Sequence, residues 1–392
     1  MELAVGQSVE CGINTVAFGS SGIARVGNRV VFVPFTVDGD RVIVEISAIK
    51  KNYCLAYLKE IVSPSPHRVS PRCPYYSSCG GCQYQHIGYE HQLLIKERQV
   101  KETFQRIGEI SFPVMKPIIP SPRTFNYRKK AEVHLARSGN ESIKAGFVNV
   151  DGDTVIDIER CDLVDEDINK QYAELRKKLV SDAVPVRKNR ITLWTGRSIS
   201  PAQVAKTVKE RMFIVPSQEF FQANGSLVDL LIDYVVDAAE YGASDTVVDC
   251  YCGCGLFASF LAPRVKKVIG IEENRKSSAA ARKNLKNHGC SNARILEGRA
   301  EKVIKTQLLR KNIPVDTVIL DPPRIGCPKR VLKDIMELSP RRIVYLSCNP
   351  ATQARDIAFL LKGNYILNHL QPFDMFPQTK HIEVLALLER KD

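Results

Sequence analysis

The chain has 392 residues, of which 44% are hydrophobic and 25% are charged, so it can form two or three globular domains. Lysine and arginine exceed aspartate and glutamate by 56 to 43, giving a net charge of +13. This excess is spread over runs at 128–130, 175–180, 186–190 and 341–343. It favours a polyanionic partner, with nucleic acid the first expectation and a generally basic proteome the alternative.

No run of about 18 apolar residues occurs, so we expect no membrane span. The opening MELAVGQSVE lacks the charged and apolar regions of a signal peptide. We therefore expect a cytoplasmic protein whose 12 cysteines are reduced thiols, metal ligands or catalysts rather than disulfides. The sequence suggests no protein partner, and we expect a monomer.

Residues 1–62 alternate apolar and polar side chains between glycine turns. VVFVPF and RVIVEI read as strands separated by the Asp38-Gly39 turn, which predicts a five-stranded barrel of the oligonucleotide-binding type. The proline- and serine-rich stretch SPSPHRVSPR then predicts a domain boundary.

Residues 63–215 mix a cysteine cluster, a helix near 88–107 and several strands, which predicts an α+β middle domain. From 216 to 392, short apolar strands alternate with helical stretches, which predicts a Rossmann-like α/β domain with a mainly parallel sheet. The predicted fold is thus multidomain, with divisions at 1–62, 63–215 and 216–392.

The stretch CPYYSSCGGC places Cys73, Cys79 and Cys82 in a C-x5-C-x2-C array. Three thiolates this close can converge on one metal centre, because Gly80-Gly81 allows tight turns. Cys161 is the candidate fourth ligand, since it lies in the same middle region. A [4Fe–4S] cluster and Zn²⁺ both suit four cysteines. Radical S-adenosylmethionine chemistry normally uses a different spacing, C-x3-C-x2-C.

In TVVDCYCGCGLFA a strand runs into a glycine turn and then a helix, so Gly253 and Gly255 allow close approach of a ligand. Glu272 ends the next strand, 17 residues beyond Gly255, where an acid can accept both ribose hydroxyls of an adenosine. The dinucleotide fingerprint's third glycine is missing, which favours S-adenosylmethionine over NAD.

Two further strands end in reactive residue types. LDPPRIGC ends in Asp321 and a rigid Pro-Pro turn, and such a turn is expected to touch the group with which the cofactor reacts. A plain strand terminator would explain the prolines but not the acid. LSCNP places Cys348 where a strand gives way to a loop. That cysteine is either a displayed thiol or a small buried hydrophobe.

The combination of C-x5-C-x2-C, FFQAN, D-x-Y-C-G-x-G, LDPPR, LSCNP and HIE resembles the RNA uracil-C5 methyltransferases over nearly the whole chain. The resemblance implies a TRAM barrel, a middle domain with a four-cysteine iron–sulfur site, and a methyltransferase domain that uses S-adenosylmethionine. The implied substrate is a uridine in 23S ribosomal RNA, with tRNA as the alternative. A catalytically impaired RNA-binding homologue and a zinc-dependent regulator are the other classes considered.

The same resemblance implies the roles of individual residues. Cys348 is the nucleophile that adds to C6 of uracil, and Glu383 is the base that removes the C5 proton. Arg324 and Arg341 are candidates for the cation that activates the thiol. The implied cofactor contacts are Gln222, Tyr251, Glu272 and Asp321. The implied cluster ligands are Cys73, Cys79, Cys82 and Cys161, which favours iron–sulfur over zinc.

Two positions depart from the family pattern. Leu256 stands where the family commonly has asparagine, and Arg299 stands where an acidic residue near the adenine is usual. Both support the impaired-homologue alternative, whereas the presence of Cys348 and Glu383 favours an active enzyme. Three aromatic residues that could stack on bases, but that fit a core role better, are Phe220, Phe221 and Tyr127.

Overall fold

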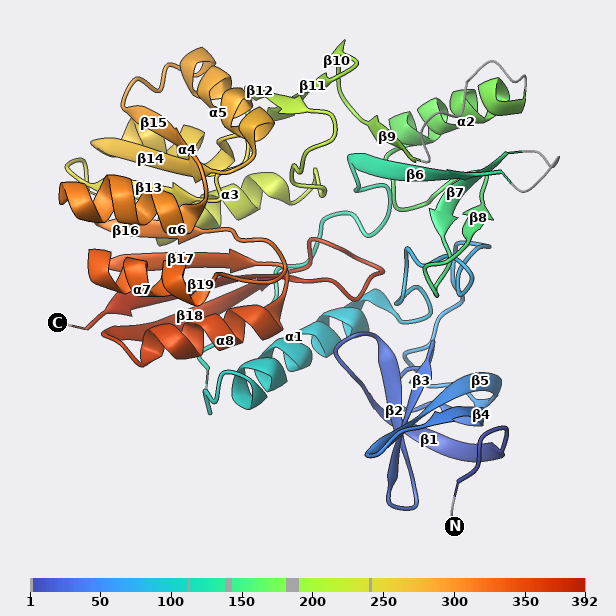
Figure 1. The fold of residues 1–392 in the computed structure, drawn as a ribbon. Coiled ribbons are helices and arrows are strands. Elements are labelled where there is room, and N and C mark those ends of the chain that lie inside the picture. Colours follow the sequence, from blue (N-terminus) through green and yellow to red (C-terminus); the bar gives the residue numbers. More distant parts are fainter. Residues whose placement is uncertain (1–2, 112, 138–142, 181–189, 240–241, 392) are drawn as a thin grey trace.

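The computed structural model describes residues 3–111, 113–137, 143–180, 190–239 and 242–391, and Figure 1 shows its fold. Most of the basic run at 186–190 lies outside the described residues.

The N-terminal part is a closed five-stranded barrel with strand order β1-β2-β3-β5-β4, which confirms the predicted barrel. Alternate residues of its strands point inward, so Val31, Val33, Val42, Val44 and Ile46 are fully buried. The strands are β1 (Ser8–Val16), β2 (Ser21–Val26), β3 (Arg29–Pro34), β4 (Arg41–Ile49) and β5 (Tyr53–Ser63).

Helix α1 (Tyr89–Arg106) leaves the barrel and crosses to the C-terminal part of the chain (Figure 1). Gln99 on this helix donates to the backbone oxygens of Val16 and Ala17 in the barrel, at 3.1 and 2.9 Å. One face of α1 contacts α8 (Pro350–Leu361). The helix therefore connects the barrel to the C-terminal domain.

Two small sheets lie between the barrel and the C-terminal domain in sequence. The first has the order β8-β7-β6-β9 and packs with α2 (Glu166–Val180). The second, β10-β11-β12, rests on α5 (Arg275–Asn287), where Asn284 Oδ1 accepts from Ile214 N at 2.8 Å. The strands are β6 (Lys130–Ala136), β7 (Lys144–Val148), β8 (Val155–Asp157), β9 (Arg190–Trp194), β10 (Ser198–Ser200), β11 (Gln203–Val208) and β12 (Arg211–Pro216).

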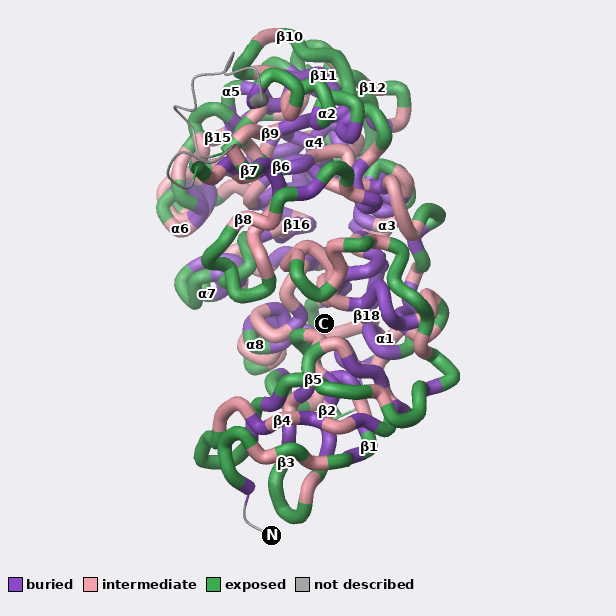
Figure 2. The backbone as a smooth tube through the Cα atoms, turned by 90° about the vertical axis from the view of Figure 1, so that its right-hand side faces the viewer, coloured by how far each residue is buried: buried purple, intermediate pink, exposed green. Residues whose placement is uncertain are grey.

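A seven-stranded sheet with order β15-β14-β13-β16-β17-β19-β18 forms the centre of the C-terminal domain. Its first five strands are parallel, and β19 runs antiparallel to both β17 and β18. The inner strands β13 and β16 are completely buried, whereas the edge strand β15 is mostly intermediate or exposed; Figure 2 colours the chain by burial. The strands are β13 (Thr246–Cys250), β14 (Lys267–Glu272), β15 (Ala293–Glu297), β16 (Thr317–Leu320), β17 (Arg342–Ser347), β18 (Tyr365–Phe373) and β19 (Glu383–Arg390).

Helices cover both faces of this sheet, because strands that are apolar on both sides must be buried on both sides. One face carries α3 (Val228–Ala238), α4 (Leu256–Leu261) and α5. The other carries α6 (Ala300–Val303), α7 (Lys329–Leu338) and α8, together with α1. Among the described residues no helix combines the length and apolar character needed to cross a bilayer.

A fully buried ion pair joins α1 to the loop that follows β18. Lys96 Nζ lies 2.6 Å from Asp374 Oδ1, and neither side chain is exposed. The ammonium also donates to Phe376 O at 3.1 Å. Burial lowers the pKa of Lys96, and the charge of Asp374 opposes that shift.

We predict that Lys96→Met lowers the free energy of unfolding by about 3–5 kcal/mol, because it leaves a buried carboxylate unpaired. Urea denaturation measures this change. The control is Arg41→Met, which removes an exposed pair with Glu10 and should cost less than about 1 kcal/mol. Equal losses in the two variants would contradict the prediction.

Candidate active site

Three predicted site residues meet at one edge of the seven-stranded sheet. Asp321 follows β16 and Cys348 follows β17, so both lie at the carboxyl ends of parallel strands. Glu383 is the first residue of β19, and the antiparallel pairing of Ser347 with Val384 brings it to the same edge. The structure therefore brings together a thiol and two carboxyls that lie far apart in sequence.

Arg324 is the cation beside Cys348. Its carbonyl oxygen accepts from Asn349 Nδ2 at 2.9 Å and from Thr352 Oγ1 at 3.1 Å, which fixes the loop above α8. Burial and the charge of Glu383 raise the pKa of Cys348 to about 11, while Arg324 opposes this rise. The alternative candidate, Arg341, is wrong: it lies at the other end of β17 and pairs with Asp245 at 2.9 Å.

The two carboxyls at this edge influence each other. Burial raises the pKa of Asp321, and it raises the pKa of Glu383 well above its usual range. The charge of Asp321 raises the pKa of Glu383 further, whereas Arg324 lowers it. Like charges in one buried site resist simultaneous ionisation, so the pair tends to hold a proton. Such a pair can exchange protons with a group bound beside Cys348.

The loop after β13 is shaped for close approach of a ligand. Tyr251, Gly253 and Gly255 all have positive φ, at 63, 52 and 79°. A Cβ built on Gly253 would meet no atom within 4 Å, so open space lies above this loop. Gly253 N donates to Glu272 Oε2 at 2.9 Å, which ties the loop to the acid ending β14. Here strand order switches direction between β13 and β16, which is where open α/β sheets bind ligands.

Two buried polar atoms near this loop have no hydrogen-bond partner among the described residues, Gln222 Oε1 and Asp249 Oδ1, whereas the Tyr251 hydroxyl lies beside the Cys327 thiol. The segment that carries Gln222 crosses the strand ends. At one end Asn274 Nδ2 donates to Glu219 Oε2 at 2.9 Å, and at the other Asn224 Nδ2 donates to Met375 O at 3.2 Å. Buried polar groups normally have partners, so these atoms mark a place where a polar ligand fits.

Sequence reasoning missed Asp249. Burial and the charge of Asp321 raise the pKa of Asp249 to about 8, although Ala258 N donates to its Oδ2 at 3.1 Å. An acid inside a run of apolar strand residues was the available signal. Its position between the glycine loop and Asp321 makes it a further polar group facing the ligand space.

The two departures from the family pattern lie in different surroundings. Leu256 begins α4 and packs into the core. Where the family commonly has a polar asparagine, this chain therefore has an apolar side chain in contact with the core. Arg299 is largely exposed and pairs with Glu301 at 2.5 Å.

Of the three aromatic candidates, Phe221 and Tyr127 are buried, whereas Phe220 is 67% exposed and free to meet a base.

All four predicted metal-binding cysteines line one cavity of about 210 Å³: Cys73, Cys79, Cys82 and Cys161. Arg128 lines the same cavity, and its charge lowers the pKa of Cys79, Cys82 and Cys161 against the opposing effect of burial. Among the described residues, however, no three His, Cys, Asp or Glu side chains are arranged to hold a metal ion.

A mainly parallel sheet with a glycine loop at its switch point is typical of domains that bind a nucleotide-like cofactor, and here a small barrel precedes it. A family model described as tRNA (Uracil-5-)-methyltransferase matches residues 186–391, and a TRAM-domain model matches residues 2–59. The chain therefore belongs to the tRNA (uracil-5-)-methyltransferase family. This confirms the class predicted from the motifs, an RNA (uracil-C5)-methyltransferase.

Individual relatives agree with this assignment. A tRNA (uracil(54)-C(5))-methyltransferase of Schizosaccharomyces pombe is 33% identical over 98% of this chain and 78% of the relative. An uncharacterized RNA methyltransferase of Gloeobacter violaceus is 32% identical over 98% of this chain and 97% of the relative. The crystal structure of a Pyrococcus abyssi tRNA (uracil-54, C5)-methyltransferase has a TM-score of 0.76 at 24% identity, covering 97% and 100% of the two chains. The last match confirms the fold.

We predict that alkylation of Cys348 in the free protein speeds up as pH rises toward about 11, because only the thiolate reacts. Arg324→Met should slow alkylation at a fixed alkaline pH, since it removes the charge that lowers this pKa. Peptide mapping by mass spectrometry separates Cys348 from the other cysteines. Arg341→Met is the matched control and should react as the wild type does; an equal slowing in both variants would rule out a local role for Arg324.

Proposed function

We propose that this protein transfers the methyl group of S-adenosylmethionine to C5 of a uridine in RNA. The observation that carries the proposal is the convergence of Cys348, Glu383 and Asp321 beside a glycine loop lined by unpartnered polar atoms. Membership of the uracil-5-methyltransferase family supports the same reaction.

The chemistry explains why a thiol and a carboxyl must meet. C5 of uracil is a weak nucleophile, and addition of the Cys348 thiolate to C6 moves electrons onto C5. S-adenosylmethionine, when bound, supplies an electrophilic methyl group to that carbon. C5 then carries both a proton and the new methyl group. Glu383 removes the proton, the C5–C6 double bond reforms, and the Cys348 sulfur leaves.

The surroundings of these groups suit both steps. Arg324 lies where it favours the ionised forms of Cys348 and Glu383. Asp321 can share a proton with Glu383, so that one of the two carboxyls stays ionised and can accept the C5 proton. We assign Gln222, Tyr251, Glu272 and Asp321 to the cofactor pocket, because Glu272 bonds to Gly253, Tyr251 belongs to the same loop, Gln222 has an unpartnered buried oxygen and Asp321 follows the neighbouring strand.

We also propose that the four-cysteine cavity holds a [4Fe–4S] cluster. A cubane places its cysteine ligands around a volume, whereas a single zinc draws four sulfurs to one point. The cavity of about 210 Å³ fits the first arrangement better, and Arg128 offers a positive charge to an anionic cluster. The methyl transfer itself needs no electron, so the cluster would serve structure.

We propose domain divisions at 1–62, 63–215 and 216–392.

The target RNA is the open part of the proposal. The barrel and cysteine site together led us to expect 23S ribosomal RNA. The Schizosaccharomyces pombe relative, however, is named for uracil 54 of tRNA, and this observation favours tRNA. In either RNA the uridine must be unstacked or flipped out, because C6 is not reachable inside a helix.

The decisive test is tritium release from RNA labelled at uridine C5, using tRNA and 23S ribosomal RNA that lack the modification. We expect release that depends on S-adenosylmethionine and disappears in Cys348→Ala. Glu383→Gln should transfer the methyl group but stall before elimination, so a methylated protein–RNA adduct should persist on a denaturing gel. Full activity of Cys348→Ala would disprove the proposed nucleophile, and the RNA that releases tritium identifies the substrate.

For the cluster, we predict that protein purified without oxygen is brown and contains iron bound with sulfide. Cys161→Ser should lose most of this iron, because it removes one ligand. Cys290→Ser is the matched control, since that thiol is also buried but lies outside the cysteine cavity. Stoichiometric zinc in place of iron would instead support the zinc alternative.

A further inference from the structure

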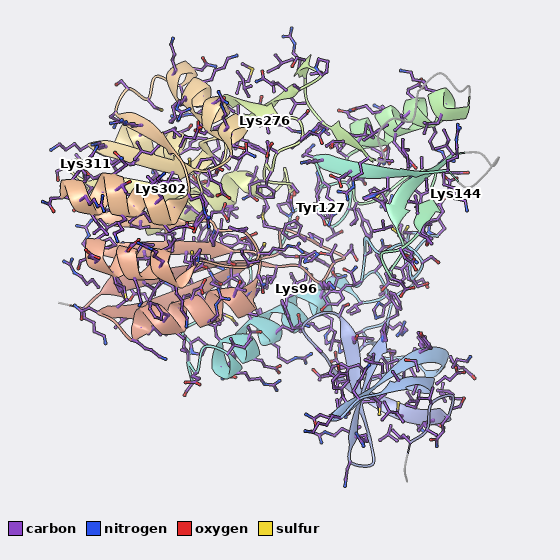
Figure 3. All side chains as sticks on the ribbon, viewed as in Figure 1. Lys96, Tyr127, Lys144, Lys276, Lys302 and Lys311 are labelled. Atoms are coloured by element: carbon purple, nitrogen blue, oxygen red, sulfur yellow. The ribbon has the colours of Figure 1, made fainter. Side chains whose placement is uncertain are left out.

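The loop between β18 and β19, residues 374–382, leads directly into Glu383. It is held from outside its own domain to an unusual degree. Lys96 on α1 bonds to Asp374 and to Phe376 O, and Tyr127 OH donates to Pro377 O at 3.0 Å. Figure 3 labels Lys96 and Tyr127 in the region between the C-terminal domain and the N-terminal half of the chain. The loop is therefore shaped by the N-terminal half of the chain.

Gln378, at the centre of this loop, adopts a strained backbone with φ of 67°. Four hydrogen bonds hold it there. Gln92 on α1 accepts from Gln378 N at 3.0 Å and donates to Gln378 Oε1 at 2.9 Å. The Gln378 carbonyl accepts from the backbone nitrogens of Gln83 and Tyr84, at 3.1 and 3.0 Å. A strained residue persists only where its surroundings determine its conformation. Here the surroundings include Gln83 and Tyr84, which follow Cys82 directly in the chain.

The side chain of Gln83 links the cysteine turn to the loop. Its Nε2 donates to Gly80 O at 2.8 Å, inside the turn between Cys79 and Cys82. Its Oε1 accepts from Lys380 N at 3.3 Å, three residues before Glu383. One amide group thus connects a turn that lines the cysteine cavity with the loop that presents the proposed base.

The loop also reaches the active site at its other end. His381 Nδ1 lies 3.5 Å from Arg324 Nη2, and Arg324 is the cation that acts on both Cys348 and Glu383. Burial and the neighbouring cations lower the pKa of His381 to about 3, so it stays neutral beside Arg324. A shift of the loop would displace Glu383, whereas the bonds from Asn349 and Thr352 to its carbonyl would keep Arg324 in place.

We propose that the cysteine turn positions the catalytic base: the conformation of residues 79–82 is transmitted through Gln83 and Gln92 to the 374–382 loop, and so to Glu383. Gln83 and Gln92 are positioning residues rather than catalytic ones. The proposal rests on the proposed uracil-C5 methylation, and it gives the cysteine site a role in the elimination step. Addition of Cys348 to uracil and methyl transfer do not require the loop, because β17 and α8 hold Cys348.

The test follows each stage of the reaction separately. Gln83→Ala and Gln92→Ala should lower kcat, by up to about 100-fold if the base moves by an ångström, with KM for RNA unchanged. Both variants should accumulate a covalent adduct that already carries the labelled methyl group. Hydrogen exchange should become faster in residues 374–382 but not in β17. A merely destabilised protein would lose adduct formation instead of accumulating adduct.

Gln99→Ala is the matched control. Gln99 lies on the same helix and is also buried, but it bonds to the barrel and to the Tyr84 hydroxyl and makes no hydrogen bond to the 374–382 loop. We expect no methylated adduct to accumulate in this variant. Equal adduct levels in the Gln92 and Gln99 variants, or none in the Gln83 and Gln92 variants, would overturn the proposal.

Cys161→Ser tests the cysteine cavity itself. In the wild-type background this change should raise the adduct level, whereas in the Gln83→Ala, Gln92→Ala double variant the rise should be much smaller, because only the backbone bonds from residues 83 and 84 to Gln378 remain. An equal rise in both backgrounds would mean that the cavity acts by another route and would overturn the proposal. Glu383→Gln separates the two proposals: if it forms no methylated adduct, the proposed reaction itself has failed.

Discussion

The active site depends on one reversal of strand direction. Five parallel strands bring their carboxyl ends to a single edge, and a further parallel strand would place its first residue at the opposite edge. Because β19 runs antiparallel, its first residue, Glu383, reaches the edge that already carries Asp321 and Cys348. The hydrogen bonds of a fully buried sheet fix this pairing. The thiol and the carboxyl therefore meet although the chain forms α8 and β18 between them.

Burial at this edge disfavours the charged forms of the carboxyl and thiol groups. Arg324 opposes this effect for some of these groups and not for others. Asp249, Asp321 and Glu383 all have raised pKa values, since carboxylates removed from water and placed near one another are costly. Arg324 favours the ionised forms of Glu383 and Cys348 alone. One well-anchored cation can thus determine which groups carry charge, and it stands between the nucleophile and the proposed base.

Local sequence patterns predicted the parts that local physics determines. Alternation in VVFVPF and RVIVEI encoded the barrel, and the apolar runs ending in Asp321 and Cys348 encoded strand ends that must share an edge. The spacing of Cys73, Cys79 and Cys82 predicted a common site, and Cys161, predicted as its fourth member, lines the same cavity. The sequence could not decide whether Arg324 or Arg341 is the cation beside Cys348, because each of them flanks a strand of the same sheet. The contacts of Gln83 and Gln92 with the 374–382 loop could not be predicted from the sequence either, since nearly 300 residues separate the partners.

Those long-range contacts divide the active site into two halves with different supports. Cys348, Arg324 and Asp321 lie at the ends of β16 and β17 and at the start of α8, and the hydrogen bonds that hold this edge lie within the C-terminal domain. The loop before Glu383 instead depends on α1, on the cysteine turn and on Tyr127. Loss of N-terminal packing would leave the nucleophile in place and disturb the base. Such an enzyme could begin its reaction and fail to finish it, leaving its RNA covalently bound. In the proposed mechanism, release of the product therefore depends on the N-terminal half of the chain as well as on the C-terminal domain.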